Sequence, residues 1–136
     1  VEISHGLWEG KLEAEIREKW PSLLKNWHDK PEEVIMPEGE SIKDVSERSI
    51  KAFEKICLSQ ENNDLTLLVA HDAVNKTLIC DILGMFYSNI WMIKQGNGGI
   101  TVIDIFNNPS KPPVISALNI TTHLGGILDS TASGAL

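Results

Sequence analysis

His71 is the residue whose type and surroundings most clearly favour chemistry. It directly follows an uncharged run, residues 65–70, and precedes a segment with helical spacing, residues 73–83. An imidazole donates, accepts or transfers protons near neutral pH. In open α/β sheets, functional groups gather at the carboxyl ends of the strands. Taken alone, His71 could equally cap a strand by bonding to a backbone carbonyl, so the rest of the chain must decide between these readings.

The elements that would position His71 are a strand and a helix. Residues 65–70 lie between polar segments, which predicts a strand buried on both faces. The apolar residues of 73–83 recur at helical spacing, and Gly84 is a suitable C-terminal cap. A buried strand that runs straight into a helix is typical of the α/β class.

Composition excludes several classes of function. A chain of 136 residues is one domain or part of one, and its net charge of -7 argues against a nucleic-acid partner. No apolar run is long enough for a membrane span. Cys57 and Cys80 fall in helical patterns without metal-ligand spacing, so we expect reduced core thiols, a cytoplasmic protein, and neither a metal nor a cofactor.

Periodicity predicts further helices on the N-terminal side. Residues 11–20 have Leu12, Ile16 and Trp20 on one face. Pro21 suits the first turn of a second helix, residues 21–28, which a loop at 29–39 would follow.

Capping and strand signals complete the expected elements. Ser41, with Asp44 three residues later, predicts the start of a long helix that ends near Leu58. Residues 100–106 and 114–118 alternate and are β-branched, which predicts an antiparallel pair. Residues 125–136 read as a small, polar tail that is poorly ordered at its end.

Taken in chain order, four stretches resemble the histidine phosphatase (phosphoglycerate mutase-like) superfamily. Residues 2–10 match its E-x-x-x-G-x-W-E-G segment, and residues 37–48 match its P-x-G-E-S-x-x-D-x-x-x-R segment. Residues 68–71 resemble the strand end that carries its second catalytic histidine, and residues 119–124 resemble its closing N-x-x-x-H-L pattern. Each stretch is moderately specific, and the order of all four makes the resemblance strong.

The resemblance implies a phosphomonoester hydrolase that forms a transient phosphohistidine. Glu2 would then be the general acid that protonates the leaving oxygen, and His71 would donate to the phosphoryl oxygens as charge builds. Trp8, Asp72 and Asn75 are candidates for the pocket wall. The partner would be a small phosphorylated substrate.

The chain also departs from the family pattern. It contains no Arg-His-Gly, so the nucleophile is missing, and Arg17 and Arg48 do not match the family's phosphate clamp. Asp72 stands where a glycine is usual. We therefore expect residues 1–136 to be the C-terminal part of a single domain whose first strand and nucleophile lie upstream.

Simpler interpretations stay open for individual residues. Glu2 could be an exposed acid at a frayed terminus, and Arg48 could be a structural partner for a carboxylate. The interval from Glu2 to His71 is short, which favours a compact, α-ribazole-phosphatase-like enzyme over a phosphoglycerate mutase. A catalytically dead binding module with the same fold is the remaining alternative.

The expected fold is a three-layer α/β/α domain, incomplete at its N-terminus, with a mostly parallel sheet and an antiparallel edge. Without a neighbouring strand, residues 65–70 would leave backbone groups unpaired. We expect the upstream segment or a second copy of the chain to fill that edge, and we expect Val1 to lie inside the fold beside it.

Overall fold

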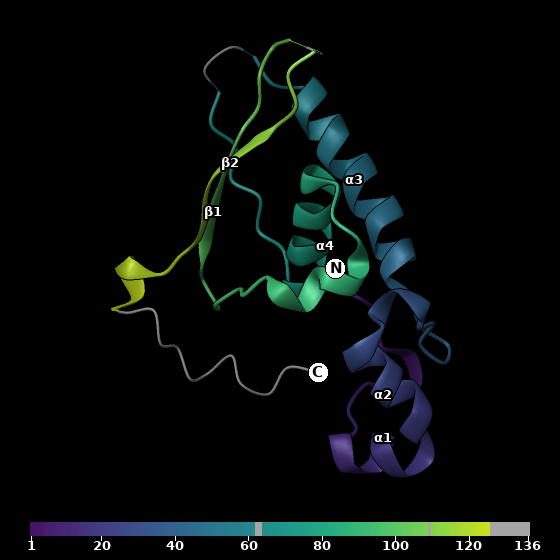
Figure 1. Cartoon of the computed structure of the whole chain (residues 1–136). Helices are drawn as coiled ribbons and strands as arrows, with labels where there is room; N and C mark the ends of the chain where they lie inside the picture. Colours follow the sequence, from purple (N-terminus) through teal and green to yellow (C-terminus); the bar gives the residue numbers. More distant parts are fainter. Residues whose placement is uncertain (62–63, 109, 126–136) are drawn as a thin grey trace. The chain divides into compact units, whose positions relative to one another are not determined.

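A computed structural model describes residues 1–61, 64–108 and 110–125 of the chain (Figure 1). The chain divides into two compact units, Val1–Trp91 and Met92–Leu136. The units are described separately below.

The first unit is helical. Along the chain come the 3-10 helix η1 (Gly6–Trp8), helices α1 (Glu13–Lys19) and α2 (Pro21–Asp29), η2 (Pro31–Glu33), α3 (Ile42–Leu58) and α4 (Asp72–Leu83), and η3 (Tyr87–Met92) reaches the boundary with the second unit. Helices α3 and α4 pack against each other, as Figure 1 also shows. The largest fully buried side chains of this unit are Trp8, Trp27, Ile16, Met36, Ile42 and Ile90.

Helix α3 begins where its capping signal predicts. The hydroxyl of Ser41 accepts a hydrogen bond from the backbone N–H of Asp44 at 3.2 Å, and the Asp44 carboxylate accepts one from the backbone N–H of Ser41 at 2.8 Å. This reciprocal pair satisfies two backbone donors that have no partner within the helix. The predicted helix is confirmed, including its end at Leu58.

Helix α4 is also confirmed, and it ends at the predicted residue. Gly84 adopts the left-handed conformation with φ 63°, which glycine tolerates without a steric penalty.

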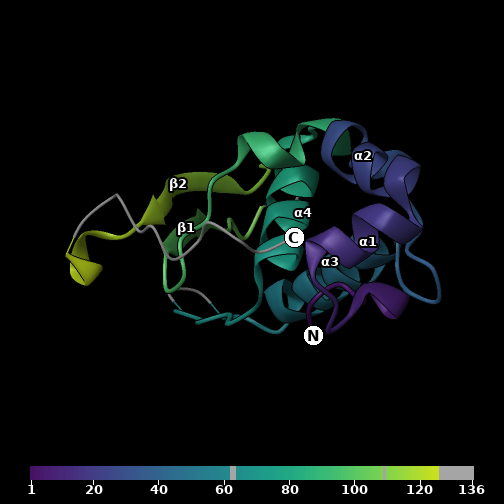
Figure 2. The same ribbon diagram turned by 90° about the horizontal axis from the view of Figure 1, so that it is seen from below.

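Helices α1 and α2 lie next to each other, as seen from below in Figure 2. Pro21 occupies the first turn of α2 as predicted, but α1 starts two residues later than the expected residue 11, and Leu12 is 71% exposed rather than buried.

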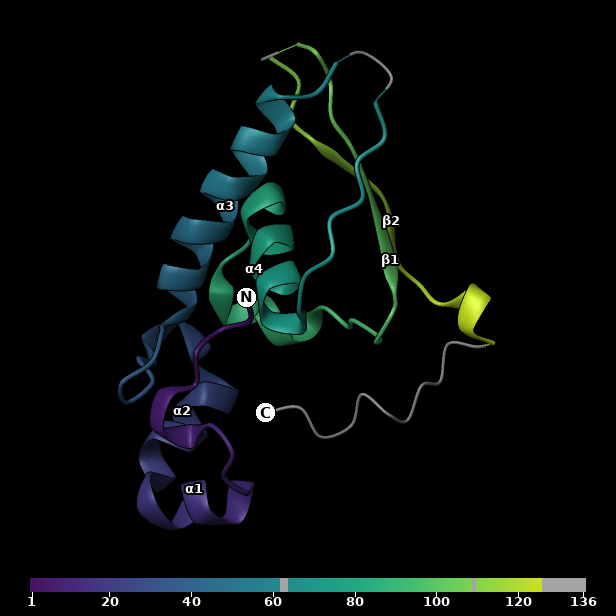
Figure 3. The same ribbon diagram turned by 180° about the vertical axis from the view of Figure 1, so that it is seen from behind.

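The prediction of a buried strand at 65–70 is wrong for the described residues. This segment forms no strand, and Figure 3 shows it as a plain trace that leads into α4. Leu65 is 99% exposed, Leu67 82% and Val69 87%. A strand requires hydrogen-bonded neighbours, and none pairs with this segment in the described part of the chain. Its apolar residues therefore face solvent.

Val1 and one of the two cysteines are more exposed than the sequence predicts. The side chain of Val1 is fully exposed, which contradicts the expectation that it lies inside the fold. Cys80 is buried, whereas Cys57 is only partly buried, and both are free thiols. Burial raises the pKa of both thiols, which favours the protonated form.

The second unit contains the predicted antiparallel pair. Strands β1 (Ile100–Asp104) and β2 (Val114–Ile120) pair with Ile100 opposite Ile120 and Asp104 opposite Val114. The 3-10 helix η4 (Thr122–Leu124) follows β2. Most of the predicted tail, residues 126–136, lies outside the described residues.

The described residues contain both helices and strands, the two kinds of element that the predicted α/β class requires. The only sheet that the described residues form has the two strands β1 and β2, so they do not build the expected parallel sheet or its three layers. Within the same residues, no helix is long and apolar enough to cross a membrane.

Candidate functional site

The carboxylate of Glu2 lies at the start of α4. Its Oε2 accepts a hydrogen bond from the backbone N–H of Ala73 at 3.2 Å, and its Oε1 accepts one from the N–H of Ile3 at 2.8 Å. Figure 3 shows the N-terminal end of the chain beside this helix. Glu2 is thus a partly buried residue with defined partners, and the alternative of a frayed, exposed acid does not fit the structure.

His71 occupies the N-cap position of the same helix. Its backbone carbonyl accepts from the N–H of Asn75 at 2.9 Å, but its imidazole makes no capping hydrogen bond. The side chain is exposed. The ring is therefore accessible to a molecule at this end of the helix, and the structure brings His71 and Glu2 to the same helix terminus.

The N-terminus of α4 suits an anion. The first backbone N–H groups of a helix lack partners within the helix, and the helix dipole makes this end partially positive. Glu2 uses the N–H of Ala73. A phosphoryl group bound at the remaining donors would share this helix end with the Glu2 carboxylate and with His71, the N-cap residue.

Asp72 is the first residue of α4 and pairs with a lysine one turn later. The Nζ of Lys76 lies 2.8 Å from Oδ2 of Asp72, and its side chain is only 12% exposed. The same ammonium group lies 5.3 Å from the ring centre of Trp91, a cation–π distance. Oδ1 of Asp72 is buried without a hydrogen-bond partner among the described residues. We did not predict Lys76, although its spacing from Asp72 is that of a helical ion pair.

The other predicted pocket residues differ in their placement. Trp8 is fully buried and packs at a tilt against Trp20, with 6.4 Å between ring centres, so its surroundings are those of a core residue. Asn75 is partly buried in the first turn of α4. A lining role for Trp8, Asp72 and Asn75 stays a prediction.

His5 lies close enough to Glu2 for the two groups to interact electrostatically. Its ring lies edge-on to Trp27, with 5.8 Å between ring centres, and Nδ1 is buried without a partner in the described structure. Burial lowers the pKa of His5, and the negative charges of Glu2 and Glu9 oppose this effect. The residue therefore favours its neutral form.

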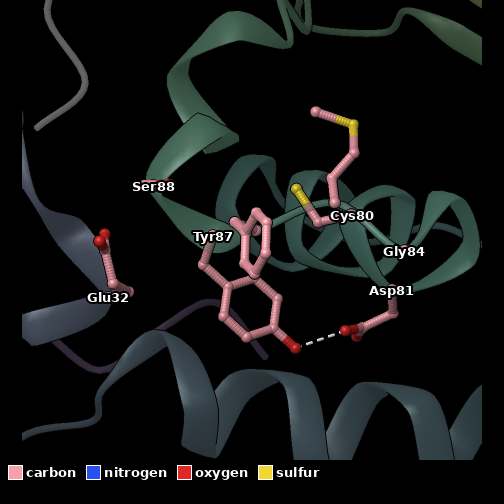
Figure 4. A pocket seen from close by; sticks show the side chains of 8 residues that line it. Glu32, Cys80, Asp81, Gly84, Tyr87 and Ser88 are labelled. Carbon is pink, nitrogen blue, oxygen red and sulfur yellow. Dashed lines mark hydrogen bonds between the residues drawn. The ribbon is translucent and has the colours of Figure 1, made fainter.

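A separate pocket of about 480 Å³ lies between η2 and the end of α4, with Glu32, Cys80 and Asp81 among its lining residues (Figure 4). At its side, the hydroxyl of Tyr87 donates a hydrogen bond to Asp81, as Figure 4 shows. The same hydroxyl lies 2.6 Å from the hydroxyl of Ser46, which is also hydrogen-bonded to Asp81. Burial, followed by the bond to Asp81, raises the pKa of Tyr87. These polar groups satisfy one another and tie α3, α4 and η3 together. The pocket includes neither Glu2 nor His71.

Comparison with known proteins decides the family. The model of the histidine phosphatase superfamily (branch 1) matches residues 1–120. The chain belongs to this superfamily. The resemblance inferred from the four sequence stretches is confirmed.

Two relatives and one solved structure show how similar this histidine phosphatase chain is to known proteins. Phosphoserine phosphatase 1 of Hydrogenobacter thermophilus is 33% identical over 125 residues, which are 92% of this chain and 57% of that protein. The 2-carboxy-D-arabinitol-1-phosphatase of Triticum aestivum is 29% identical over 118 residues, 87% of this chain and 23% of that protein. The solved structure of Bacillus stearothermophilus YhfR has a TM-score of 0.76 at 25% identity, with 85% of this chain and 55% of that chain covered.

Histidine phosphatase relatives are thus longer than this chain, which spans 57% of the first curated relative and 55% of the YhfR chain. The matched region contains both Glu2 and His71. The activity of a whole protein, including its substrate and partners, is therefore a matter of proposal.

Proposed function

We propose that this chain is the C-terminal part of a phosphomonoester hydrolase that acts through a phosphohistidine. Glu2 is its general acid, and His71 donates a hydrogen bond to the transferring phosphoryl group. The nucleophilic histidine and the arginine clamp come from residues outside 1–136, because the sequence contains no Arg-His-Gly.

One observation carries the proposal: the bond from the Ala73 backbone to Glu2. It joins residues that are 71 positions apart and places an acid beside the helix end that His71 caps. Phosphoryl transfer depends mainly on positioning and on hydrogen-bond donors aimed at the developing charge. The site combines these donors with a carboxyl group that can protonate a leaving oxygen.

The hydrogen bonds of Glu2 hold its carboxyl group in a defined position. Both oxygens accept backbone N–H bonds, one from Ile3 and one from Ala73. A phosphoryl group at the same helix end would therefore lie beside a fixed carboxyl group that can protonate its leaving oxygen.

We propose small organic phosphate monoesters as the substrate class. The names of the two curated relatives specify different phosphate esters, phosphoserine and 2-carboxy-D-arabinitol 1-phosphate. This range supports the general reaction, hydrolysis of a monoester, over any single substrate. Phosphoserine belongs in the first test panel because the 33% identical relative is named for it.

The experiment compares residues 1–136 with the intact domain, meaning the same residues together with the segment that supplies the nucleophile. We expect phosphate release and an acid-labile, base-stable phosphoprotein only in the intact domain. The phosphoryl group should then be attached to a histidine outside residues 1–136. Transfer of the phosphoryl group to an added sugar phosphate, instead of to water, would indicate a mutase. Turnover by residues 1–136 alone that survives His71→Ala would overturn the proposal.

A further inference from the structure

Glu2 lies in a segment without regular secondary structure. Residues 1–5 are neither helical nor part of a strand, and the side chain of the neighbouring Val1 is fully exposed. A general acid must keep its geometry, since a misplacement of about 1 Å can cost roughly 100-fold in rate. The fixed position of Glu2 therefore requires contacts from elsewhere in the first unit.

Arg48, on α3, supplies contacts on both sides of Glu2. Its Nη1 donates to the backbone carbonyl of Val1 at 2.9 Å, and its Nη2 donates to the carbonyl of Glu2 at 3.0 Å. The same guanidinium binds the carboxylate of Glu40 through Nε at 2.8 Å and through Nη2 at 3.0 Å. One planar group thus joins a carboxylate to two successive backbone carbonyls.

Glu40 completes the arrangement on the other side. Its Oε2 accepts from the backbone N–H of Ser4 at 2.9 Å, and its own N–H donates to the carbonyl of Ser4 at 2.9 Å. Glu40 and Arg48, which we call the Glu40–Arg48 clamp, therefore hold the backbone before and after Glu2. The capping pair at the start of α3 orders the turn that links the two clamp residues.

Two glycines allow these segments to approach so closely. A Cβ atom at Gly39 would lie 2.4 Å from the carbonyl oxygen of Ser4. At Gly6, which has φ 54°, a Cβ atom would lie 2.1 Å from the carbonyl oxygen of Pro37. A side chain at either position would force the segment of Glu2 away from the clamp.

We propose that Arg48, oriented by Glu40, is the positioning residue that fixes the general acid Glu2 against the N-terminus of α4. This inference rests on the proposed role of Glu2. Arg48 does not contact the Glu2 carboxylate, so it acts through the backbone. A lysine cannot replace it, because a single ammonium group lacks the rigid fork that reaches a carboxylate and two carbonyls together.

If the Glu40–Arg48 pair only stabilises the fold, its loss should have a different effect on the kinetics. Loss of such a pair lowers the amount or stability of folded enzyme and slows all substrates equally. Loss of a positioning residue for the acid slows substrates according to their need for a proton, since poor leaving groups depend on protonation and good ones do not. The leaving-group dependence therefore separates the two roles.

The test uses the intact domain and a series of phosphate monoesters, from aryl esters with acidic phenols to alkyl esters. We expect Arg48→Lys to slow alkyl esters roughly 10- to 100-fold more than the best aryl ester. In the Glu2→Gln background, the same substitution should add less than about twofold, because the acid is already absent. Arg17→Lys is the matched control, since Arg17 pairs with Glu13 on an exposed face of α1.

Equal slowing of all esters by Arg48→Lys, or an effect that multiplies with that of Glu2→Gln, would overturn the inference. If Arg48→Lys does not fold, Glu40→Gln tests the same clamp with a residue of the same shape, and the same pattern is required. A failure of the proposed function is distinguishable: Glu2→Gln itself would then show no dependence on the leaving group.

Discussion

The carboxylate of Glu2 accepts a hydrogen bond at 3.2 Å from the backbone N–H of Ala73, two residues after His71. This contact joins the N-terminal segment to the first turn of α4 and brings an acid and an imidazole to one helix end. In a histidine phosphatase chain, these are the residues expected to handle the leaving oxygen and the phosphoryl group. The predictions below test whether they act together.

Replacement of His71 should impair the chemical step. In the intact domain, we expect His71→Ala to lower kcat by ~10²–10³, the scale found for loss of one preorganised donor. His28→Ala is the control, because His28 is an exposed residue near the end of α2. Steady-state kinetics with one aryl ester measure both variants. A loss of less than about threefold for His71→Ala would indicate a structural role.

The Glu40–Arg48 clamp should weaken in acid. In the folded protein, the hydrogen bond that the Glu40 carboxylate accepts from Arg48 is the main cause that lowers the pKa of Glu40. The clamp therefore contributes stability above the ordinary pKa of a glutamate, about 4.3. This contribution is lost as the pH falls through the lower, folded pKa, because the unfolded state binds the proton first.

Denaturant unfolding of the wild type and Glu40→Gln at several pH values measures this effect. We expect the wild type to be more stable above about pH 5 and the difference to shrink steadily below about pH 4. Asp44→Asn is a useful comparison, because the hydrogen bonds from Ser41 lower the pKa of Asp44 without any arginine. A wild-type advantage that stays constant down to pH 2 would contradict the assigned cause.

Residues 65–70 should become protected when a neighbouring strand is present. We propose that the upstream segment pairs with this exposed, apolar run, whose Leu65 is 99% exposed in the first unit. Hydrogen exchange of its amides should slow by at least roughly 100-fold from residues 1–136 to the intact domain. The amides of α3 serve as an internal reference, since they are already bonded within the helix.

A second copy of the chain is the alternative neighbour. In that case, the protection would appear in residues 1–136 alone, and it would fall on dilution together with the measured mass. Amides that exchange at the same rate in both proteins and at all concentrations would show that this run does not pair in either way.

Local signals in the sequence predicted the helices well. Gly84 ends α4, and the reciprocal pair of Ser41 and Asp44 begins α3, because each signal satisfies backbone groups a few residues away. The Asp72–Lys76 spacing would have predicted that ion pair in the same way. The described antiparallel strands β1 and β2 were predictable because they are close in the chain.

Contacts between residues that are far apart in the sequence could not be predicted from local signals. The strand at 65–70 was predicted from its composition, but its formation depends on neighbours that no local signal supplies. Arg48 contacts the carbonyl of Glu2, 46 positions away, and Glu2 contacts the N–H of Ala73, 71 positions away. The sequence alone could identify Arg48 as a partner for a carboxylate, but it could not predict either of these distant contacts. The motif match could place Glu2 and His71 in one site only through resemblance.

The most direct test of the account is the leaving-group dependence of Glu2→Gln in the intact domain. If Glu2 protonates the leaving oxygen, the substitution should slow alkyl phosphates by ~10²–10⁴ and leave esters of the most acidic phenols within about threefold of the wild type. The measurement is kcat/KM for each ester at one pH, with Glu9→Gln as the control for loss of a nearby charge. Equal slowing across the whole series would contradict the assignment of Glu2 as the general acid.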